Sequence, residues 1–249
     1  MYHFYTDKSH IGDSTISLTG EDVNHIKNVL RMRQGEEIII CDGEGKDYHC
    51  RISALESDRI DTEILEQRAS ESEMPVKIYL FQGLPKKDKM EMIIQKNVEL
   101  GVFEIVPVMT RRVIVKLDDE KKEAKKLERW QAISESAAKQ SGRGIIPKID
   151  RVMSFKEALE WAGHMDMSII PYENADSSPE GMAASLQLIS SLKGKDSAAV
   201  FIGPEGGFEP EEIELAMQYG VKPVSLGKRI LRTETAGLML MSVAGFICN

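Results

Sequence analysis

Beyond residue 75 the chain alternates between short apolar segments typical of strands and segments whose apolar residues recur at helical spacing. Apolar residues three or four positions apart mark the helices, as at Met90, Ile93 and Ile94. Because parallel strands need a crossover, usually a helix, this alternation predicts an α/β domain with a mainly parallel sheet over residues 75–249. The strand-like segments are VKIYLFQGL (76–84), EIVPVM (104–109), MSIIPYE (167–173), AAVFIG (198–203) and KPVSLG (222–227).

Other stretches of this region carry their own signals. A long helix is expected over 127–140, and a shorter one with Glu209 or the residue before it as cap and Pro210 in its first turn. The stretch ENADSSPEGMAAS (173–185) is expected to be a flexible loop or a lid. The last segment, 236–248, is apolar all round but too short for a membrane span of roughly 20 residues, so we expect a helix buried in protein.

Residues 1–70 have a different character, with short extended runs separated by turn residues. Closely spaced runs over 37–41, 48–54 and 59–65 are typical of an all-β unit. Thr19 is placed to cap one interrupting helix. The polar segment RASESEMP (68–75) ends in proline and is predicted to be a linker. The chain is therefore expected to have domains of residues 1–70 and 75–249.

The net charge of −8 argues against a generally basic surface for nucleic acid. Of the 32 basic and 40 acidic side chains, residues 1–73 hold 8 and 16, which leaves 24 of each in the remainder. Any contact with RNA must therefore depend on local basic clusters.

The cysteines Cys41, Cys50 and Cys248 are odd in number and lack metal-ligand spacing. We therefore expect neither disulfides nor a metal centre. The N-terminal segment MYHFYTDKSH has no apolar stretch of the kind found in signal peptides. These features predict a cytoplasmic protein.

The segment IGPEGGF (202–208) joins a predicted strand to a predicted helix. Its three glycines allow positive φ and close approach of the backbone to a ligand. The first turn of the next helix offers free N–H groups to an anion. The residue order differs from both the P-loop and the dinucleotide fingerprint. The segment is either a tight turn or a ligand site, since open α/β sheets bind ligands at the carboxyl ends of their strands.

A second segment, LGKRILRTETA (226–236), lies between the last strand and the apolar helix. Thr233 or Thr235 can cap that helix. Arg232 is expected to lie against apolar surface, where its charge needs a partner or a function. The alternative is a capped helix start with solvated charges.

Together, GPEGGF and LGKRILRTETA resemble the SPOUT superfamily of methyltransferases. The combination is most similar to the family that methylates N3 of a uridine in small-subunit (16S) ribosomal RNA. The resemblance extends over almost the whole chain through VLRMRQGEEI (29–38), KKDKMEMIIQKNVELGVFEIVPVMTRR (86–112) and SESAAKQSGRGIIPKI (134–149). It implies a PUA-like β-barrel for RNA binding at residues 1–70, followed by a SPOUT domain with a deep trefoil knot.

The resemblance also implies S-adenosylmethionine as cofactor, held by three loops mostly through backbone groups, and a homodimer. Adenine is expected against aliphatic and glycine residues of 226–231, which suit a flat ring. The implied cofactor-binding residues are Ile170, Pro171, Glu173, Ile202, Gly203, Pro204, Gly206, Gly207, Leu226, Gly227, Ile230, Leu231, Thr235 and Ala236.

The chemistry of uridine N3 sets the catalytic requirement. N3 carries a proton at neutral pH, so either this proton must be acidified or the uracil anion stabilised. A guanidinium stays charged and has planar donors, which makes Arg232 the candidate for stabilising the anion. Arginine is a poor base, so the base is expected to be Glu205, Glu234 or water. Alternatively, Arg232 only pairs with an acid and holds its loop.

Contacts with 16S ribosomal RNA, free or within the assembled small subunit, are expected from local basic clusters, although each residue alone also suits a solvated face. His25 and His49 are expected to be structural or surface residues. Two other functions stay open: a SPOUT ribose 2′-O-methyltransferase acting on rRNA or tRNA, and a non-catalytic RNA-binding ribosome-assembly factor. The candidate RNA-binding residues are Lys27, Arg31, Arg33, Lys86, Lys87, Lys89, Arg111, Arg112, Lys139 and Arg143.

Overall fold

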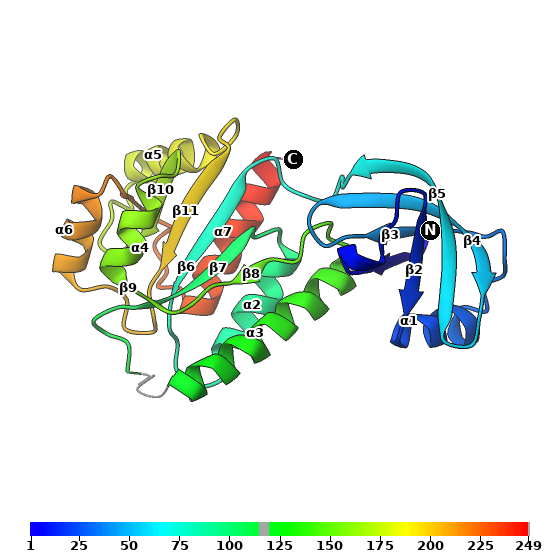
Figure 1. The fold of residues 1–249 in the computed structure, drawn as a ribbon. Helices are drawn as coiled ribbons and strands as arrows, with labels where there is room; N and C mark the ends of the chain where they lie inside the picture. The colour runs from blue at the N-terminus through cyan, green and yellow to red at the C-terminus, as the bar shows by residue number, and fades with distance from the viewer. Residues whose placement is uncertain (115–119, 249) are drawn as a thin grey trace. The chain divides into compact units, whose positions relative to one another are not determined.

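The computed structural model describes residues 1–114 and 120–248, and the chain divides into two compact units (Figure 1). Met1–Glu73 and Ala138–Ile146 form the first unit, and Met74–Ala137 and Pro147–Asn249 form the second. The segment 138–146 therefore groups with the N-terminal unit, whereas the sequence pattern places it in the second domain. Among the described helices, none is both long and apolar enough to cross a membrane.

The first unit is built on a mixed five-stranded sheet with the strand order β1-β3-β4-β5-β2. Only β1 and β3 pair in parallel, and the other neighbours among these strands are antiparallel. The predicted extended runs correspond to β3, β4 and β5, while the short strands β1 and β2 were not predicted. The strands are β1 (His3–Tyr5), β2 (Thr15–Thr19), β3 (Glu37–Cys41), β4 (Lys46–Leu55) and β5 (Arg59–Ala69).

The predicted helix of this unit begins later than the sequence suggested. Helix α1 (Glu21–Asn24) continues as a π-helical turn over His25–Val29. Its N-cap is Gly20, which has φ 72° and makes no side-chain capping bond. Thr19 is therefore not the cap but the last residue of β2. The helix still buries Val23 and Ile26 in the core of the unit, as the helical spacing requires.

The second unit contains the parallel sheet that the alternation of segments predicts. Its strand order is β12-β10-β11-β6-β7-β8, with β9 pairing to β7, and every described pair is parallel. The predicted α/β class is thereby confirmed. The strands are β6 (Lys77–Gly83), β7 (Glu104–Met109), β8 (Lys148–Ile149), β9 (Met153–Ser154), β10 (Met167–Pro171), β11 (Ser197–Ile202) and β12 (Lys222–Val224).

Helices cover both faces of this sheet (Figure 1). On one face, Phe81 and Phe201 stack with their ring centroids 4.7 Å apart and pack against Phe155 of α4. On the other face, α7 packs against α2 and contacts β11. The helices are α2 (Lys89–Glu99), α3 (Glu120–Ser141), α4 (Phe155–Ala162), α5 (Pro179–Ser190), α6 (Pro210–Gln218) and α7 (Thr233–Cys248).

Two helix starts show where local signals succeed and where they were overlooked. Glu209 is the N-cap of α6, as predicted, and its backbone N–H donates to Glu212 at 2.9 Å. The predicted loop at 173–185, in contrast, is helical from Pro179. The hydroxyl of Ser178 caps α5 by accepting from the backbone N–H of Gly181 at 3.1 Å. A serine followed by proline is a helix-start signal in its own right.

A buried carboxyl in the sheet gives the fold a dependence on pH. Glu104 of β7 is 9% exposed. Burial raises the pKa of its carboxyl to about 7, with Lys148 opposing the shift and Asp150 adding to it. The folded protein therefore holds this proton more tightly than the unfolded chain, whose pKa is near 4.5. Stability should fall as the pH rises from about 4.5 through about 7.

Replacing Glu104 by glutamine should remove this loss, because the amide keeps the shape of the side chain and cannot ionise. We expect the thermal midpoint of Glu104→Gln to exceed that of the wild type at pH 8 and the difference to shrink toward pH 4.5. Differential scanning calorimetry over this range measures it. A constant difference between the two proteins at every pH would contradict the assignment.

Candidate functional site

A cavity of about 490 Å³ opens where three parallel strands of the second unit end. Its walls come from residues 171–173 after β10, 202–208 after β11 and 226–233 after β12. Lys89, Ser177 and Ala236 complete the lining. The two segments selected from the sequence are therefore brought together, because parallel neighbours end at the same edge of a sheet.

The glycine segment is a tight turn and a cavity wall at once. Gly207 has φ 70°, a left-handed conformation that favours glycine, and its N–H donates to the Pro204 carbonyl at 2.9 Å. A Cβ on Gly203 would lie 3.1 Å from the backbone of Gly207, a tight contact that the turn could relieve only by shifting. The sequence left open whether this segment is a tight turn or a ligand site, and the structure shows that a tight turn can also be the wall of a cavity.

An arginine holds the outer side of this turn. Arg112 donates to the carbonyl of Gly206, and its guanidinium meets both carboxylate oxygens of Glu209 at 2.9 Å. Hydrogen bonding from Arg112 is the main reason why the pKa of Glu209 lies below its ordinary value. Arg112 therefore links the glycine turn, through the Gly206 carbonyl, to Glu209, the residue just before α6.

A buried hydrogen-bond chain holds the inner side. Gln82 of β6 is fully buried, and its amide donates to the hydroxyl of Thr233 at 2.9 Å. Thr233, at the start of α7, in turn donates to the Gly203 carbonyl at 2.6 Å. One hydroxyl therefore links the sheet, the glycine turn and the end of the 226–233 segment.

A lysine lies between two acidic side chains beside the cavity. The Lys89 amine is 3.2 Å from Glu205 and 3.3 Å from Glu234. Hydrogen bonding to Glu205 is the main cause of a raised pKa for Lys89. Burial raises the pKa of Glu205, but backbone N–H donors, including that of Lys86, and the ammonium of Lys89 outweigh it and leave this pKa below its usual range. Both groups of the Lys89–Glu205 pair are therefore charged at neutral pH.

Most of the residues selected from the sequence line the cavity, and three do not. Ile170 is completely buried in the sheet and does not line the cavity. Thr235 is exposed in the first turn of α7 and does not line the cavity. Glu234 is not part of the lining either, although it pairs with Lys89 beside it. The selected residues that do line the cavity are Pro171, Glu173, Ile202, Gly203, Pro204, Glu205, Gly206, Gly207, Leu226, Gly227, Ile230, Leu231, Arg232 and Ala236.

Arg232 differs from the sequence expectation. Its side chain is 80% exposed instead of pressed against apolar surface, and its guanidinium is 4.0 Å from Glu234. It lies in the segment just before α7, where side chains need not pack into the core. Arg232 is thus a lining residue of the cavity whose side chain is open to solvent.

Sequence reasoning did not select several other lining residues. Lys89 was grouped with the neighbouring Lys86 and Lys87 as a surface cation, and only the fold separates it from them. Lys228 and Arg229 belong to the segment 226–236, but neither of them was assigned a role in ligand binding from the sequence. The remaining lining residues are Tyr172, Ser177, Phe208 and Thr233.

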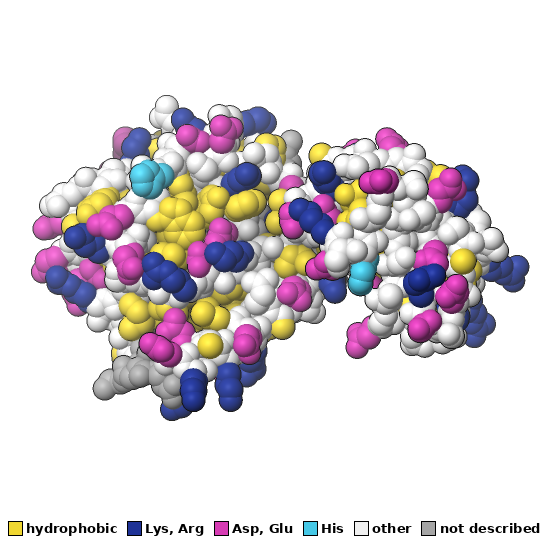
Figure 2. Space-filling model, viewed as in Figure 1, with side chains coloured by type: hydrophobic (Ala, Val, Ile, Leu, Met, Phe, Trp, Pro, Cys, Tyr) yellow, Lys and Arg dark blue, Asp and Glu magenta, His cyan; other side chains and the backbone are white. Residues whose placement is uncertain are grey.

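The candidate RNA-binding residues belong to both units. Arg143 is 3% exposed and pairs with Glu73 within the first unit, so it is structural and not available to RNA. Lys139 also belongs to the first unit, where its amine lies 5.9 Å from the ring of Tyr5. Basic and acidic side chains are interspersed on the face shown in Figure 2. The described residues form no broad basic field on that face.

The remaining candidates are placed in two groups. Lys27, Arg31 and Arg33 lie on or after the helical segment of the first unit, and Lys27 donates to the Glu56 carbonyl at 2.6 Å. Lys86, Lys87, Arg111 and Arg112 belong to the second unit. Both arginines make ion pairs with α6 and the residue before it, at Glu211 and Glu209.

Both parts of the chain match models of known protein domains. A model of the RNA methyltransferase domain matches residues 72–245, and a model of the RNA methyltransferase PUA domain matches residues 18–65. The chain belongs to the RNA methyltransferase family. The family membership suggested by the two C-terminal motifs is thereby confirmed.

Individual relatives are similar over almost their whole length. The ribosomal RNA small subunit methyltransferase E of Bacillus subtilis is 39% identical over 93% of this chain and 90% of its own. The protein of the same name from Mesomycoplasma hyopneumoniae is 34% identical over 97% and 98%. A crystal structure of the Neisseria gonorrhoeae enzyme of that name, bound to S-adenosyl methionine, has a TM-score of 0.80 and 34% identity over 99% of this chain and 98% of its own.

The buried hydroxyl of Thr233 offers a test of the site. Thr233→Val keeps the shape of the side chain but removes the donor to the Gly203 carbonyl and one of the two acceptors of the Gln82 amide, which also donates to the Gly83 carbonyl. The loss of these bonds should cost about 1–3 kcal/mol. We expect a folded protein whose affinity for S-adenosylmethionine is about tenfold lower, measured by isothermal titration calorimetry. Thr235→Val is the matched control and should bind as the wild type does. Equal losses in both variants would show that the hydroxyl at 233 has no special role.

Proposed function

We propose that the protein transfers a methyl group from S-adenosylmethionine to N3 of a specific uridine in 16S ribosomal RNA, in the cytoplasm. The observation that carries the proposal is the cavity at the sheet edge, where the glycine turn and the 226–236 segment meet with the exposed Arg232 at the wall. Relatives named for small-subunit ribosomal RNA, one of them solved with S-adenosyl methionine, support it.

The cavity suits this cofactor. Its volume of about 490 Å³ lies within the range of small-molecule sites. Glycines in two of its three walls leave backbone groups accessible, and Ile202, Leu226 and Leu231 provide aliphatic surface for an adenine ring. Bound there, S-adenosylmethionine would supply an electrophilic methyl group on its sulfonium.

The residues of the chain would prepare the uracil. The Arg232 guanidinium is charged, exposed and planar, so it can donate to a carbonyl oxygen beside N3 and stabilise the anion. Several donors already hold the oxygens of Glu205 and lower its pKa, which makes this carboxylate a poor proton acceptor. Glu234 or water therefore remains as the proton acceptor, with Glu234 the nearer carboxylate to Arg232.

We further propose a PUA-like β-barrel that binds RNA in the N-terminal unit and a deep trefoil knot in the C-terminal domain. The match of residues 18–65 to a PUA-domain model supports the first. The second follows from the resemblance of the two C-terminal motifs to the SPOUT superfamily. True knots are rare, so chain tracing through an experimental map is the appropriate test.

A homodimer is proposed from the surface of α7. Within the chain this helix is not buried all round, since a stripe over 235–246 remains exposed and Phe246 is 91% exposed. Two of its exposed side chains, Met239 and Phe246, are large and apolar, and a second copy related by a two-fold axis would cover them. Phe246→Asp should convert the dimer to a monomer in sedimentation velocity at micromolar concentration, with Ser242→Ala as control. A wild type that sediments only as a monomer would refute the dimer.

Mapping the transferred methyl group tests the main proposal. Purified protein, S-adenosylmethionine and either free 16S RNA or small ribosomal subunits from a strain lacking the modification should yield 3-methyluridine by mass spectrometry of nucleosides. A 2′-O-methylated nucleotide would support the ribose methyltransferase instead. RNA binding without cofactor binding in calorimetry would support an assembly factor.

The role of Arg232 has its own test. Arg232→Ala should leave cofactor affinity nearly unchanged while slowing methyl transfer by about 10²–10³, the loss typical of one charge-stabilising donor. Single-turnover rates at saturating cofactor, together with calorimetric affinities, separate the two effects. A rate loss explained entirely by weaker cofactor binding would assign Arg232 a purely structural role.

A further inference from the structure

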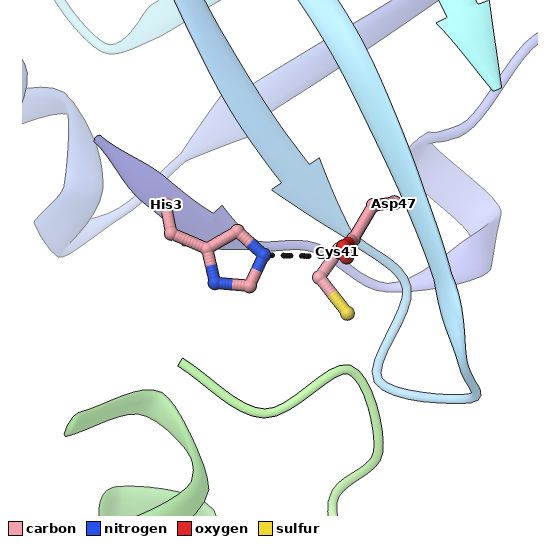
Figure 3. Close-up of side chains that lie close together, drawn as sticks. All are labelled: His3, Cys41 and Asp47. Atoms are coloured by element: carbon pink, nitrogen blue, oxygen red, sulfur yellow. Dashed lines mark hydrogen bonds and ion pairs between the residues drawn. The ribbon is translucent and has the colours of Figure 1, made fainter. Parts of the chain in front are cut away.

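Three side chains of different chemistry meet at one point of the first unit, far in sequence from the residues that line the cavity. His3 comes from β1, Cys41 from the end of β3 and Asp47 from β4 (Figure 3). The His3 Nε2 atom is 3.3 Å from a carboxylate oxygen of Asp47. One ligand atom from each of the three residues lies within 4.8 Å of the other two.

The pairing of the strands explains why sequence spacing does not show this cluster. Cys41 lies opposite Asp47 in the antiparallel β3–β4 pair and opposite Tyr5 in the parallel β1–β3 pair. His3 is two residues before Tyr5, so its side chain lies on the same face of the sheet. The sequence contains no short metal-binding motif, because each residue comes from a different strand.

The cluster is sheltered from solvent. Cys41 is completely buried and Asp47 is 8% exposed, while the side chain of His3 is 20% exposed. A buried carboxylate, thiol and imidazole in contact need compensation for their lost hydration. Part of this compensation comes from the contact between His3 and Asp47. Another part comes from the Cys41 thiol, which donates to the Gly144 carbonyl at 3.1 Å.

A backbone donor also faces the sulfur. The backbone N–H of Gly43 donates to the Cys41 Sγ atom at 3.2 Å. Such outer hydrogen bonds orient the ligands of a metal and tune their basicity. The sulfur therefore accepts from a fixed donor on one side and faces the imidazole and the carboxylate on another.

We propose that His3, Cys41 and Asp47 bind a Zn²⁺ ion. Cysteine sulfur, histidine nitrogen and aspartate oxygen are the ligands that zinc takes in proteins, and three protein ligands with water in the fourth position make a tetrahedral site. Ligand atoms around tetrahedral zinc are roughly 3.3–3.8 Å apart, given bond lengths of about 2.0–2.3 Å. The His3–Asp47 separation already meets this spacing.

The ion would have a structural role, because none of the three ligands lines the cavity of the second unit. It would tie β1, which is only three residues long, to β3 and β4. Mixed thiolate, imidazole and carboxylate ligands do not suit Mg²⁺ or Ca²⁺, which take oxygen. This proposal is independent of the methyltransferase activity.

Cobalt(II), a spectroscopic substitute for zinc, provides the test. Untagged full-length protein, treated with a chelator and dialysed, is titrated with Co²⁺ and then with Zn²⁺. We expect one Co²⁺ per chain, a thiolate-to-cobalt absorption band in the near ultraviolet and strong visible bands of a tetrahedral site, all lost when one equivalent of Zn²⁺ displaces the cobalt. The thermal midpoint of the first unit should rise with Zn²⁺, since a ligand of the native state stabilises it.

Variants assign the ligands. His3→Ala, Cys41→Ser and Asp47→Asn should each weaken Zn²⁺ binding more than about 100-fold, because even outer partners of a metal are worth about 10–100-fold. His49→Ala and Cys50→Ser are matched controls. His49 pairs with Glu37 at 2.9 Å, and Cys50 is buried in the core of the same unit, so both should bind as the wild type does.

His3→Ala keeps the test valid if a buried variant fails to fold, because this side chain is only partly buried. Circular dichroism without metal confirms that each variant is folded. Absence of the charge-transfer band in the wild type would overturn the proposal. Zn²⁺ binding that survives in His3→Ala, or that is lost in His49→Ala, would also overturn it, because other residues would then hold the ion.

Discussion

The parallel pairing of β10, β11 and β12 is the constraint on which the candidate site depends. In a parallel sheet all strands end at the same edge, so segments that are distant in sequence must meet there. Packing alone leaves such loops free to move. The hydroxyl of Thr233, buried between the Gln82 amide and the Gly203 carbonyl, fixes the glycine turn against the start of α7. The backbone groups that the turn offers to a ligand are therefore positioned by the sheet itself.

The charges around the cavity follow a second constraint. Two carboxylates near one site repel each other, and a cation between them removes that cost. Lys89 has this position between Glu205 and Glu234. Because the amine is committed to the acids, the exposed Arg232 is left to act on a ligand. This division of cations is what makes a charge-stabilising role for Arg232 consistent with two acids close by.

The sequence predicts those features whose causes are local. Five strands of the parallel sheet (β6, β7, β10, β11 and β12), the glycine turn and the cap of α6 at Glu209 all depend on nearby residues, and each was predicted close to its observed position. The two-residue strands β8 and β9 were not predicted. Other features depend on tertiary contacts. The place of Lys89, the burial of Ile170 and the exposure of Arg232 follow from how the sheet and α7 pack. Ser178 and Pro179 are a local signal for the start of α5, but the small polar residues around them are typical of a loop, and the helix was not predicted.

The ion pairs also decide where RNA recognition is best sought. A phosphate that binds Arg112 must compete with the carboxylate of Glu209, which meets the guanidinium through both oxygens. Lys139 groups instead with the N-terminal unit, where it opposes the burial that raises the pKa of Asp22. Charges farther apart than about 8 Å are largely screened at physiological salt, so the acidic balance of residues 1–73 does not cancel a local cluster. The N-terminal group of Lys27, Arg31 and Arg33, with Lys139 in the same unit, is therefore the stronger hypothesis for phosphate contact.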